Sequence, residues 1–254
     1  MNSNEKQQNK LEKLSLQRVK KAVGGIINEH YFGLSDVDIK EFEELLRTIK
    51  PNKDSNDFPD FLCSKGFIEH FAVTSSNEGR KGAVHKAEKT KFESMSRKIK
   101  ENLSPEKKKV KNTFEYPEHS YADLVKSFEK NFLKHIESLE KYDTKKEIGI
   151  FLVDYEDYGA LSMAELSLEG VNEINIGDLG EQEILDNYRL TRDKKMLDWL
   201  FKFKDRIDYL IFATPKNVEV IKINNIQKLQ TLLPYEYAIR SNFGTVITEN
   251  WIQF

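Results

Sequence analysis

The stretch EIGIFLVDYED, residues 147–157, is the feature that most constrains the fold of this chain. A near-continuous apolar run that ends in acids is typical of a central strand buried on both faces of a sheet. Just before it, residues 120–141 carry an apolar face at helical spacing, which predicts a long helix packed on that sheet. Two further apolar runs, DYLIFATP and VEVIKI, predict more strands. The sequence therefore predicts an α/β protein with a mixed central sheet flanked by helices.

The first half of the chain predicts two helices followed by a hairpin. Apolar residues including Leu11, Leu14, Val19 and Val23 recur at nearly helical spacing, which predicts a helix over residues 10–29. Ser35 precedes a second helical pattern that Pro51 ends. FLC, SKG and FIEHFAVTSS then read as a hairpin, with a Ser-Lys-Gly turn. A further helix is expected over about 181–205.

The chain of 254 residues is expected to form one domain, because no repeat or linker divides it. It consists of an N-terminal helical extension (1–30), a core (35–225) and an aromatic C-terminal docking segment (226–254). Cys63 is the only cysteine, as expected in a reducing compartment. No apolar leader and no run of eighteen apolar residues is present, so we expect a cytoplasmic protein that does not enter a membrane.

Charge is balanced overall but segregated along the chain. The net charge is −2, yet residues 79–112 hold twelve Lys and Arg against four Glu, a local charge of +8. Basic residues such as Arg80, Lys86 and Lys89 are expected to contact a nucleic-acid backbone. The alternative is a solvated helix face. Residues 147–190 carry a net charge of −10, which leaves open a docking surface for a basic protein partner.

Two carboxylates in the predicted hairpin are the strongest candidates for chemistry. Asp60 opens the first strand and Glu69 lies within the second, so the two can lie nearly opposite each other. Glu69 shares its face with Phe67 and Phe71, which suggests a specific partner rather than bulk water. Because two close carboxylates repel each other, a divalent cation would stabilise the pair. Alternatively, Asp60 caps a turn and Glu69 pairs with a lysine. His70, on the other face, is expected to be a packed core residue.

The segment FPDFLCSKGFIEHFAV resembles the core of the PD-(D/E)XK nuclease superfamily. In that superfamily a Pro-Asp opens one strand, an acid lies midway along the next, and a lysine follows two residues later. Pro59-Asp60 and Glu69 match the first two elements, and the predicted element order over residues 35–155 matches the family's α-β-β-β-α-β order. The resemblance implies a restriction-endonuclease-like core with an extra N-terminal helix and C-terminal additions.

The resemblance also implies site residues and a cofactor. Phe71 stands where the family has its lysine, so the charge is expected from a displaced Lys81 or Lys86, with Lys81 preferred. Asp60 and Glu69 are expected to hold Mg²⁺ or Mn²⁺, with Glu43 or its neighbour Glu44 as a third carboxylate. No GxGxxG, Walker A or GxSxG sequence is present, so nucleotide-cofactor chemistry, ATP hydrolysis and serine hydrolysis find no support.

The expected function is therefore metal-dependent hydrolysis of phosphodiester bonds in DNA by an endonuclease, and the family resemblance suggests a role in bacterial or phage defence. RNA is not excluded as a substrate. The alternative is a catalytically inactive nuclease-fold protein that binds nucleic acid or a partner protein, and the N-terminal helix could also pair two copies of the chain.

Overall fold

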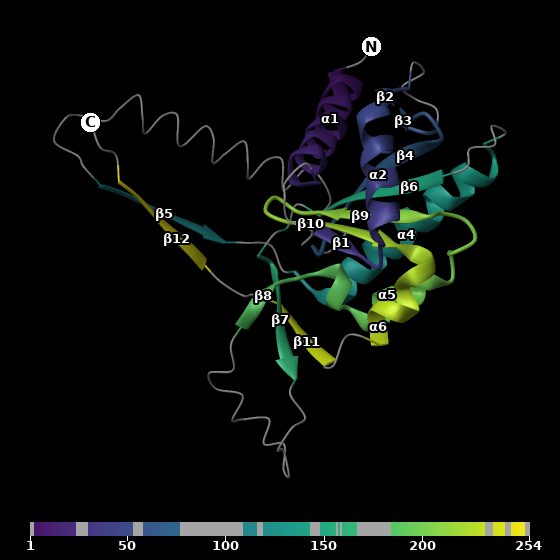
Figure 1. Cartoon of the computed structure of the whole chain (residues 1–254). Helices are drawn as coiled ribbons and strands as arrows, with labels where there is room; N and C mark the ends of the chain where they lie inside the picture. The colour runs from purple at the N-terminus through teal and green to yellow at the C-terminus, as the bar shows by residue number, and fades with distance from the viewer. Residues whose placement is uncertain are drawn as a thin grey trace, which may run out of the picture.

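The computed structural model describes residues 3–23, 30–52, 58–76, 109–115, 119–142, 148–155, 157, 159–166, 184–231, 236–241 and 245–251. At its centre lies a seven-stranded mixed sheet with the strand order β1-β10-β9-β6-β4-β3-β2 (Figure 1). These strands are β1 (Tyr31–Phe32), β2 (Lys50–Pro51), β3 (Phe61–Leu62), β4 (Gly66–Val73), β6 (Ile148–Tyr155), β9 (Tyr209–Ala213) and β10 (Val218–Lys222). The predicted α/β class, with a mixed sheet flanked by helices, is confirmed.

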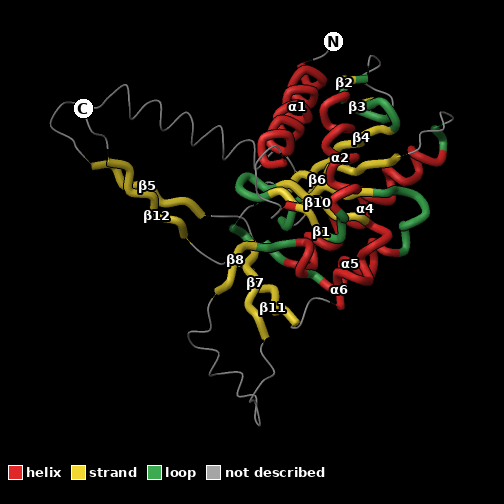
Figure 2. The backbone as a smooth tube through the Cα atoms, viewed as in Figure 1, coloured by secondary structure: helices red, strands yellow, loops and turns green. Residues whose placement is uncertain are grey.

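Parallel pairing dominates the middle of the sheet, and the edge strand β1 is also parallel to its neighbour β10. Strands β4, β6 and β9 are parallel, whereas β10 runs antiparallel to β9, and β3 runs antiparallel to both β4 and β2. A parallel pair needs a crossover connection, and α4 (Tyr121–Glu140) lies on the connection from β4 to β6. The other helices of the body are α1 (Ser3–Val23), α2 (Asp36–Thr48), α5 (Lys194–Phe201) and α6 (Ile226–Thr231) (Figure 2).

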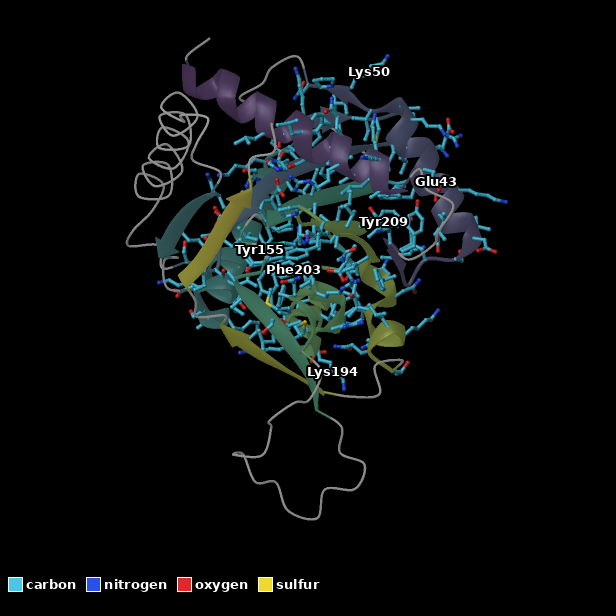
Figure 3. All side chains as sticks on the ribbon, turned by 90° about the vertical axis from the view of Figure 1, so that its left-hand side faces the viewer. Glu43, Lys50, Tyr155, Lys194, Phe203 and Tyr209 are labelled. Carbon is cyan, nitrogen blue, oxygen red and sulfur yellow. The ribbon has the colours of Figure 1, made fainter. Side chains whose placement is uncertain are left out.

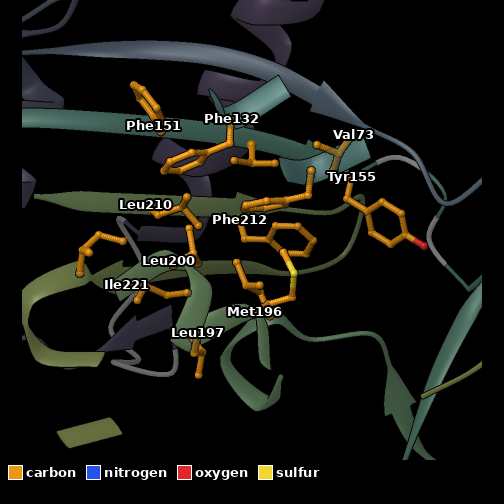
Figure 4. Close-up of a cluster of buried hydrophobic side chains, with 14 of the residues drawn as sticks. Val73, Phe132, Phe151, Tyr155, Met196, Leu197, Leu200, Leu210, Phe212 and Ile221 are labelled. Atoms are coloured by element: carbon orange, nitrogen blue, oxygen red, sulfur yellow. The ribbon is translucent and has the colours of Figure 1, made fainter. Parts of the chain in front are cut away.

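The sheet separates two hydrophobic cores. One core joins β4, β6, β9 and β10 to α4, α5 and α6, and Figure 4 shows part of it around Phe132 and Phe212. The other joins the opposite face of the same strands to α1 and α2. All eight residues of β6 are buried, and they alternate between the two cores: Phe151 faces α4, and Leu152 faces α1 and α2. This is the two-sided burial that the apolar run predicted.

Local sequence signals account for the start of α2 and for the hairpin. The Ser35 side chain accepts a hydrogen bond from the Asp38 N–H, and the Asp38 carboxylate accepts one from the Ser35 N–H. The helix α2 therefore begins with a capping box. The predicted hairpin is confirmed as β3 and β4. Its glycine is required by close packing, because a Cβ atom on Gly66 would lie 2.3 Å from the carbonyl oxygen of Ile148. Gly66 therefore lets β4 and β6 approach each other.

Two predicted helices differ from the structure. Residues 181–205 do not form one helix: β8 (Ile184–Asn187) and a 3-10 turn precede α5, which begins only after Asp193 caps it by accepting a hydrogen bond from Met196 N. The first helix was predicted over 10–29; the structure has it from Ser3 to Val23, and residues 24–29 lie outside the described part.

Smaller sheets involve the C-terminal residues. Strand β11 (Glu236–Ser241) pairs with β7 (Leu161–Leu166), which also pairs with β8, and β12 (Thr245–Trp251) pairs with β5 (Lys109–Glu115). The β5–β12 pair lies apart from the seven-stranded sheet (Figure 1). Among the described helices, none combines the length and the apolar character that crossing a membrane requires.

Candidate functional site

Asp60 lies directly before the first residue of β3, opposite Glu69 in the register of the hairpin. Phe61 pairs with Ile68, so one residue further along the ladder Asp60 faces Glu69. The Asp60 N–H donates a hydrogen bond to Glu69 Oε2 over 3.1 Å, and the His70 N–H donates to Asp60 Oδ2 over 2.8 Å. The Asp60 carboxylate thus accepts the hydrogen bond from the His70 N–H. If β3 were longer, one of its backbone carbonyls would accept that bond instead. Side chains on both faces of the sheet lie next to Asp60.

On the α4 face, Glu69 is bound by a histidine. Glu69 is 6% exposed, and its Oε1 lies 2.6 Å from His135 Nδ1. The ring of Phe71 stacks on the His135 imidazole, with centroids 4.7 Å apart and planes 10° from parallel. The specific partner expected for Glu69 is therefore an imidazole from α4. His135 was not among the predicted site residues, although it lies seven residues after Phe128 and three after Phe132, on the apolar face of that helix.

On the other face, α1 supplies a second carboxylate. One ligand atom from each of Glu12, Asp60 and His70 lies within 4.8 Å of the other two. Among the residues whose side chains are described, no other three Asp, Glu, His or Cys groups come so close. Glu12 is 7% exposed, and it lies four residues before buried Leu16 and seven before buried Val19. That spacing was the signal for an inward-facing carboxylate.

The helix α1 is oriented by a partly buried ion pair next to this group. Asp154 of β6 accepts hydrogen bonds from Ser15 Oγ and from Arg18 Nη1, the latter over 2.8 Å. Burial raises the pKa of Asp154, but interactions with His70 and Ser15 and the charge of Arg18 outweigh it and leave that pKa below its usual range. Leu11 and Leu14, predicted to be on the apolar face of this helix, are each 46% exposed. Part of the buried face of α1 is therefore formed by the polar contacts of Ser15 and Arg18 and not by these leucines.

The electrostatics single out Asp60. Burial, followed by the charges of Glu69 and Glu12, raises the pKa of the Asp60 carboxyl to about 7, although the hydrogen bond from the His70 backbone opposes the shift. Among the described residues, no lysine or arginine forms an ion pair with any of these three carboxylates. A cation placed here would therefore offset repulsion that no lysine or arginine in the described part of the chain compensates.

The donor set fits a divalent cation. Carboxylate oxygens suit Mg²⁺ and Mn²⁺, and an imidazole nitrogen extends the choice to ions such as Zn²⁺. His70 Nε2 is buried and has no hydrogen-bond partner, so the group contains a nitrogen with unused bonding capacity. Glu69 contributes less directly, because each of its oxygens already has a hydrogen-bond partner.

The predicted site residues are only partly assembled in the described structure. Asp60 and Glu69 lie together, as predicted. Neither Glu43 nor Glu44 joins them. Glu43 accepts a hydrogen bond from Tyr31 Oη over 3.0 Å, and Tyr31 belongs to β1, at the far edge of the sheet from β3. Glu44 is exposed and accepts a hydrogen bond from Arg47 Nη1 over 3.1 Å. Figure 3 places Glu43 on the same side of the molecule as Tyr209 of β9. The predicted basic residues lie outside the described part of the chain: Arg80, Lys81, Lys86 and Lys89.

No model of a known protein family, no curated protein and no solved structure matches this chain.

Proposed function

We propose that this chain is a metal-dependent nuclease that hydrolyses phosphodiester bonds in DNA, with Asp60 as its central metal ligand. One observation carries the proposal: Asp60 lies against Glu69 at the mouth of the hairpin, with its pKa raised to about 7 and no described lysine or arginine paired with it. Strongly perturbed carboxylates of this kind are concentrated at functional sites.

The order of the elements supports the same proposal. Helix α2 is followed by β2, β3, β4 and β5, and then by α4 on the crossover to β6. Apart from β5, which pairs with β12 in a separate sheet, this order corresponds to the α-β-β-β-α-β order that the PD-(D/E)XK resemblance implies. Asp60 precedes the second of these strands and Glu69 lies within the third, where the resemblance expects its two acids.

The roles of the side chains follow from their contacts. A bound divalent cation would activate a water molecule and neutralise charge developing on the phosphate. Asp60 would hold it, with its carboxylate fixed by the His70 backbone. Glu69 would fix the backbone of Asp60 with one oxygen and orient His135 with the other.

The basic group that the reaction needs has two candidates. Phe71 cannot supply it, so we keep Lys81 as the displaced lysine. His135 is the described alternative: it is bound to Glu69, and its side chain is 18% exposed, so it can exchange protons with solvent. A histidine oriented by a carboxylate is a common arrangement for a general base.

A catalytically inactive protein of the same fold, which binds nucleic acid or a protein, is the second candidate. The position of Phe71 favours it, because this side chain is 6% exposed and packs against the rings of Phe128, Phe132 and Phe151. The usual lysine position has become part of a hydrophobic core, which is what loss of the chemistry would leave behind.

Cleavage assays distinguish the two candidates. The full chain is incubated with linear, circular and single-stranded DNA and with RNA, in Mg²⁺, in Mn²⁺ or in EDTA. The variants are Asp60→Asn, Glu69→Gln, His135→Gln and Lys81→Gln, with the exposed Glu44→Gln as the matched control. We expect cleavage that requires a metal, that is lost in Asp60→Asn and that is unchanged in Glu44→Gln. Uncut substrate that is retarded on a gel would instead support the inactive binder.

A further inference from the structure

We propose that Glu12, Asp60 and His70 together bind one divalent first-row transition-metal ion, for which Mn²⁺ is the probe, and that this ion fastens α1 to the sheet. The inference names the ligands and the class of the cation. It shares Asp60 with the proposed function but needs no nuclease activity, because an ion can be bound here without any cleavage of nucleic acid.

The three side chains come from parts of the chain that only the fold brings together. Glu12 lies on α1, Asp60 before β3 and His70 within β4, and their ligand atoms lie within 4.8 Å of one another. Two ligands on opposite sides of an ion, each about 2.1 Å from it, are about 4.2 Å apart. A small side-chain adjustment therefore brings all three onto one ion.

His70 provides the independent sign that a ligand is missing. Its side chain is 9% exposed, and its buried Nε2 has no hydrogen-bond partner. The nearest recorded carboxylate oxygen, Asp154 Oδ2, is 3.9 Å away, which is too far for a hydrogen bond. A buried polar nitrogen without a hydrogen bond destabilises the fold, so such atoms are rare in folded proteins. A bound ion is the kind of close polar partner that Nε2 lacks within hydrogen-bonding distance.

The donor chemistry selects the class of ion. Two carboxylates and one imidazole form a mixed oxygen and nitrogen set. Mg²⁺ prefers oxygen ligands and retains its water, whereas Mn²⁺ and the later first-row ions accept nitrogen more readily. We therefore expect Mn²⁺ to bind more tightly than Mg²⁺, and His70 to account for much of that difference.

Glu12 gives the inference a signature that a purely structural role does not share. In the metal-free chain its charge lies close to that of Asp60 and raises the pKa of that carboxyl. Replacing it by glutamine relieves repulsion, so Glu12→Gln is expected to unfold at a higher temperature than the wild type in EDTA. The same change removes a ligand, so the gain in melting temperature on adding Mn²⁺ should be smaller in the variant.

The test uses the full chain, stripped of metal with EDTA and then dialysed. Binding of Mn²⁺ is followed by the loss of the free-ion electron paramagnetic resonance signal, and thermal unfolding is followed by circular dichroism with and without Mn²⁺. We expect the wild type and the control Glu44→Gln to bind one Mn²⁺ with equal affinity. Glu12→Gln and His70→Gln should each lose tenfold or more in affinity, with Mg²⁺ binding less affected by His70→Gln.

The inference is overturned if the folded wild type binds no Mn²⁺, or if both variants remain folded and bind it as the wild type does. If His70→Gln fails to fold, Glu12→Gln alone tests the inference. Its melting temperature in EDTA should be higher than that of the wild type, and its gain in melting temperature on adding Mn²⁺ should be smaller. Mn²⁺ binding that depends on both residues, in a protein that cuts no substrate, supports this site and refutes the nuclease. Metal-dependent cleavage with unchanged Mn²⁺ affinity in both variants supports the nuclease and refutes this site.

Discussion

One carboxylate oxygen of Glu69 accepts a hydrogen bond from the backbone N–H of Asp60 over 3.1 Å, and the other lies 2.6 Å from His135 Nδ1. One buried side chain therefore joins the open end of the β3–β4 hairpin to α4. Asp60 cannot move without disturbing this bond, so its position depends on a residue from the opposite strand and, through it, on a helix more than sixty residues away in sequence.

Glu69→Ala should destabilise the fold by about 2 kcal/mol, because it leaves two partly buried donors, Asp60 N–H and His135 Nδ1, without their acceptor. Glu69→Gln should lose less, since its amide oxygen can still accept one of these bonds. Urea unfolding followed by circular dichroism in EDTA measures both. Equal stability of the alanine variant and the wild type would mean that these hydrogen bonds contribute nothing to the hairpin.

The stability of the metal-free chain should fall as pH rises from about 4 to about 7. The pKa of Asp60 is raised from 3.8 in the unfolded chain to about 7 in the folded one, so between these values the folded state holds a proton that the unfolded state has lost. Stability from this group is therefore fully present below pH 3.8 and is lost as pH rises through 7. The whole effect is up to about 4 kcal/mol.

Asp60→Asn isolates this effect, because asparagine does not titrate and can still accept the bond from the His70 backbone. Relative to this variant, the wild type should become less stable with each step from pH 4.5 to 6 and 7.5 in urea unfolding with EDTA present. A stability difference that stays constant over this range would show that Asp60 is not the titrating group.

The sequence was sufficient to predict the elements whose apolar spacing is dictated by burial. β6 is buried on both faces and α4 on one, so the patterns of both are unambiguous and their positions are confirmed. The turn at Gly66 was found for a partly wrong reason, since the close approach of Ile148 requires this glycine. The helix predicted over 181–205 was wrong because Asp193 was read as part of a helix that it in fact begins.

Glu12 and His135 could not be predicted as site residues from the sequence, because charged and polar residues on helices are normally assumed to face water. Asp60 and Glu69 could be paired from the hairpin register alone. Glu12 and His135 lie on helices whose docking against β4 is set by the tertiary fold, and neither residue is close to the hairpin in sequence. Glu43 was placed at the wrong end of the sheet for the same reason: the direction in which α2 presents it depends on β1.

Arg18→Met should destabilise the fold by about 1–2 kcal/mol at pH 7, because it removes the cationic partner of the buried Asp154 carboxylate, which keeps its hydrogen bond from Ser15. The lowered pKa of Asp154 means that the pair stabilises the fold above that group's usual pKa and that the contribution is lost as pH falls through the lowered value. In the double variant with Asp154→Asn, much of the loss should be recovered. Urea unfolding of the four proteins gives the coupling energy, and strictly additive losses would contradict a direct pair.

Nucleic-acid binding should weaken steeply with salt if the basic segment contacts the phosphate backbone. Replacing Arg80, Lys86 and Lys89 together by glutamine should reduce the slope of log affinity against log salt by about 3 for duplex DNA. Replacing the exposed Lys202 and Lys204 by glutamine is the control and should leave the slope unchanged. Fluorescence anisotropy with a labelled duplex in EDTA measures the slopes, and identical slopes in all three proteins would place the phosphate contacts elsewhere.

Phe71→Lys would restore the residue that the PD-(D/E)XK resemblance expects, yet we expect it to impair the protein. The new ammonium group would be buried among Phe128, Phe132 and Phe151 beside the His135 ring, which should destabilise the fold by more than about 3 kcal/mol. Phe71→Leu, which keeps the site apolar, should lose only about 1.5 kcal/mol. Urea unfolding compares the two, and cleavage is assayed on whatever remains folded. If Phe71→Lys were stable and cut DNA faster than the wild type, the position could still accommodate the family's lysine, and neither His135 nor Lys81 would be needed as its replacement.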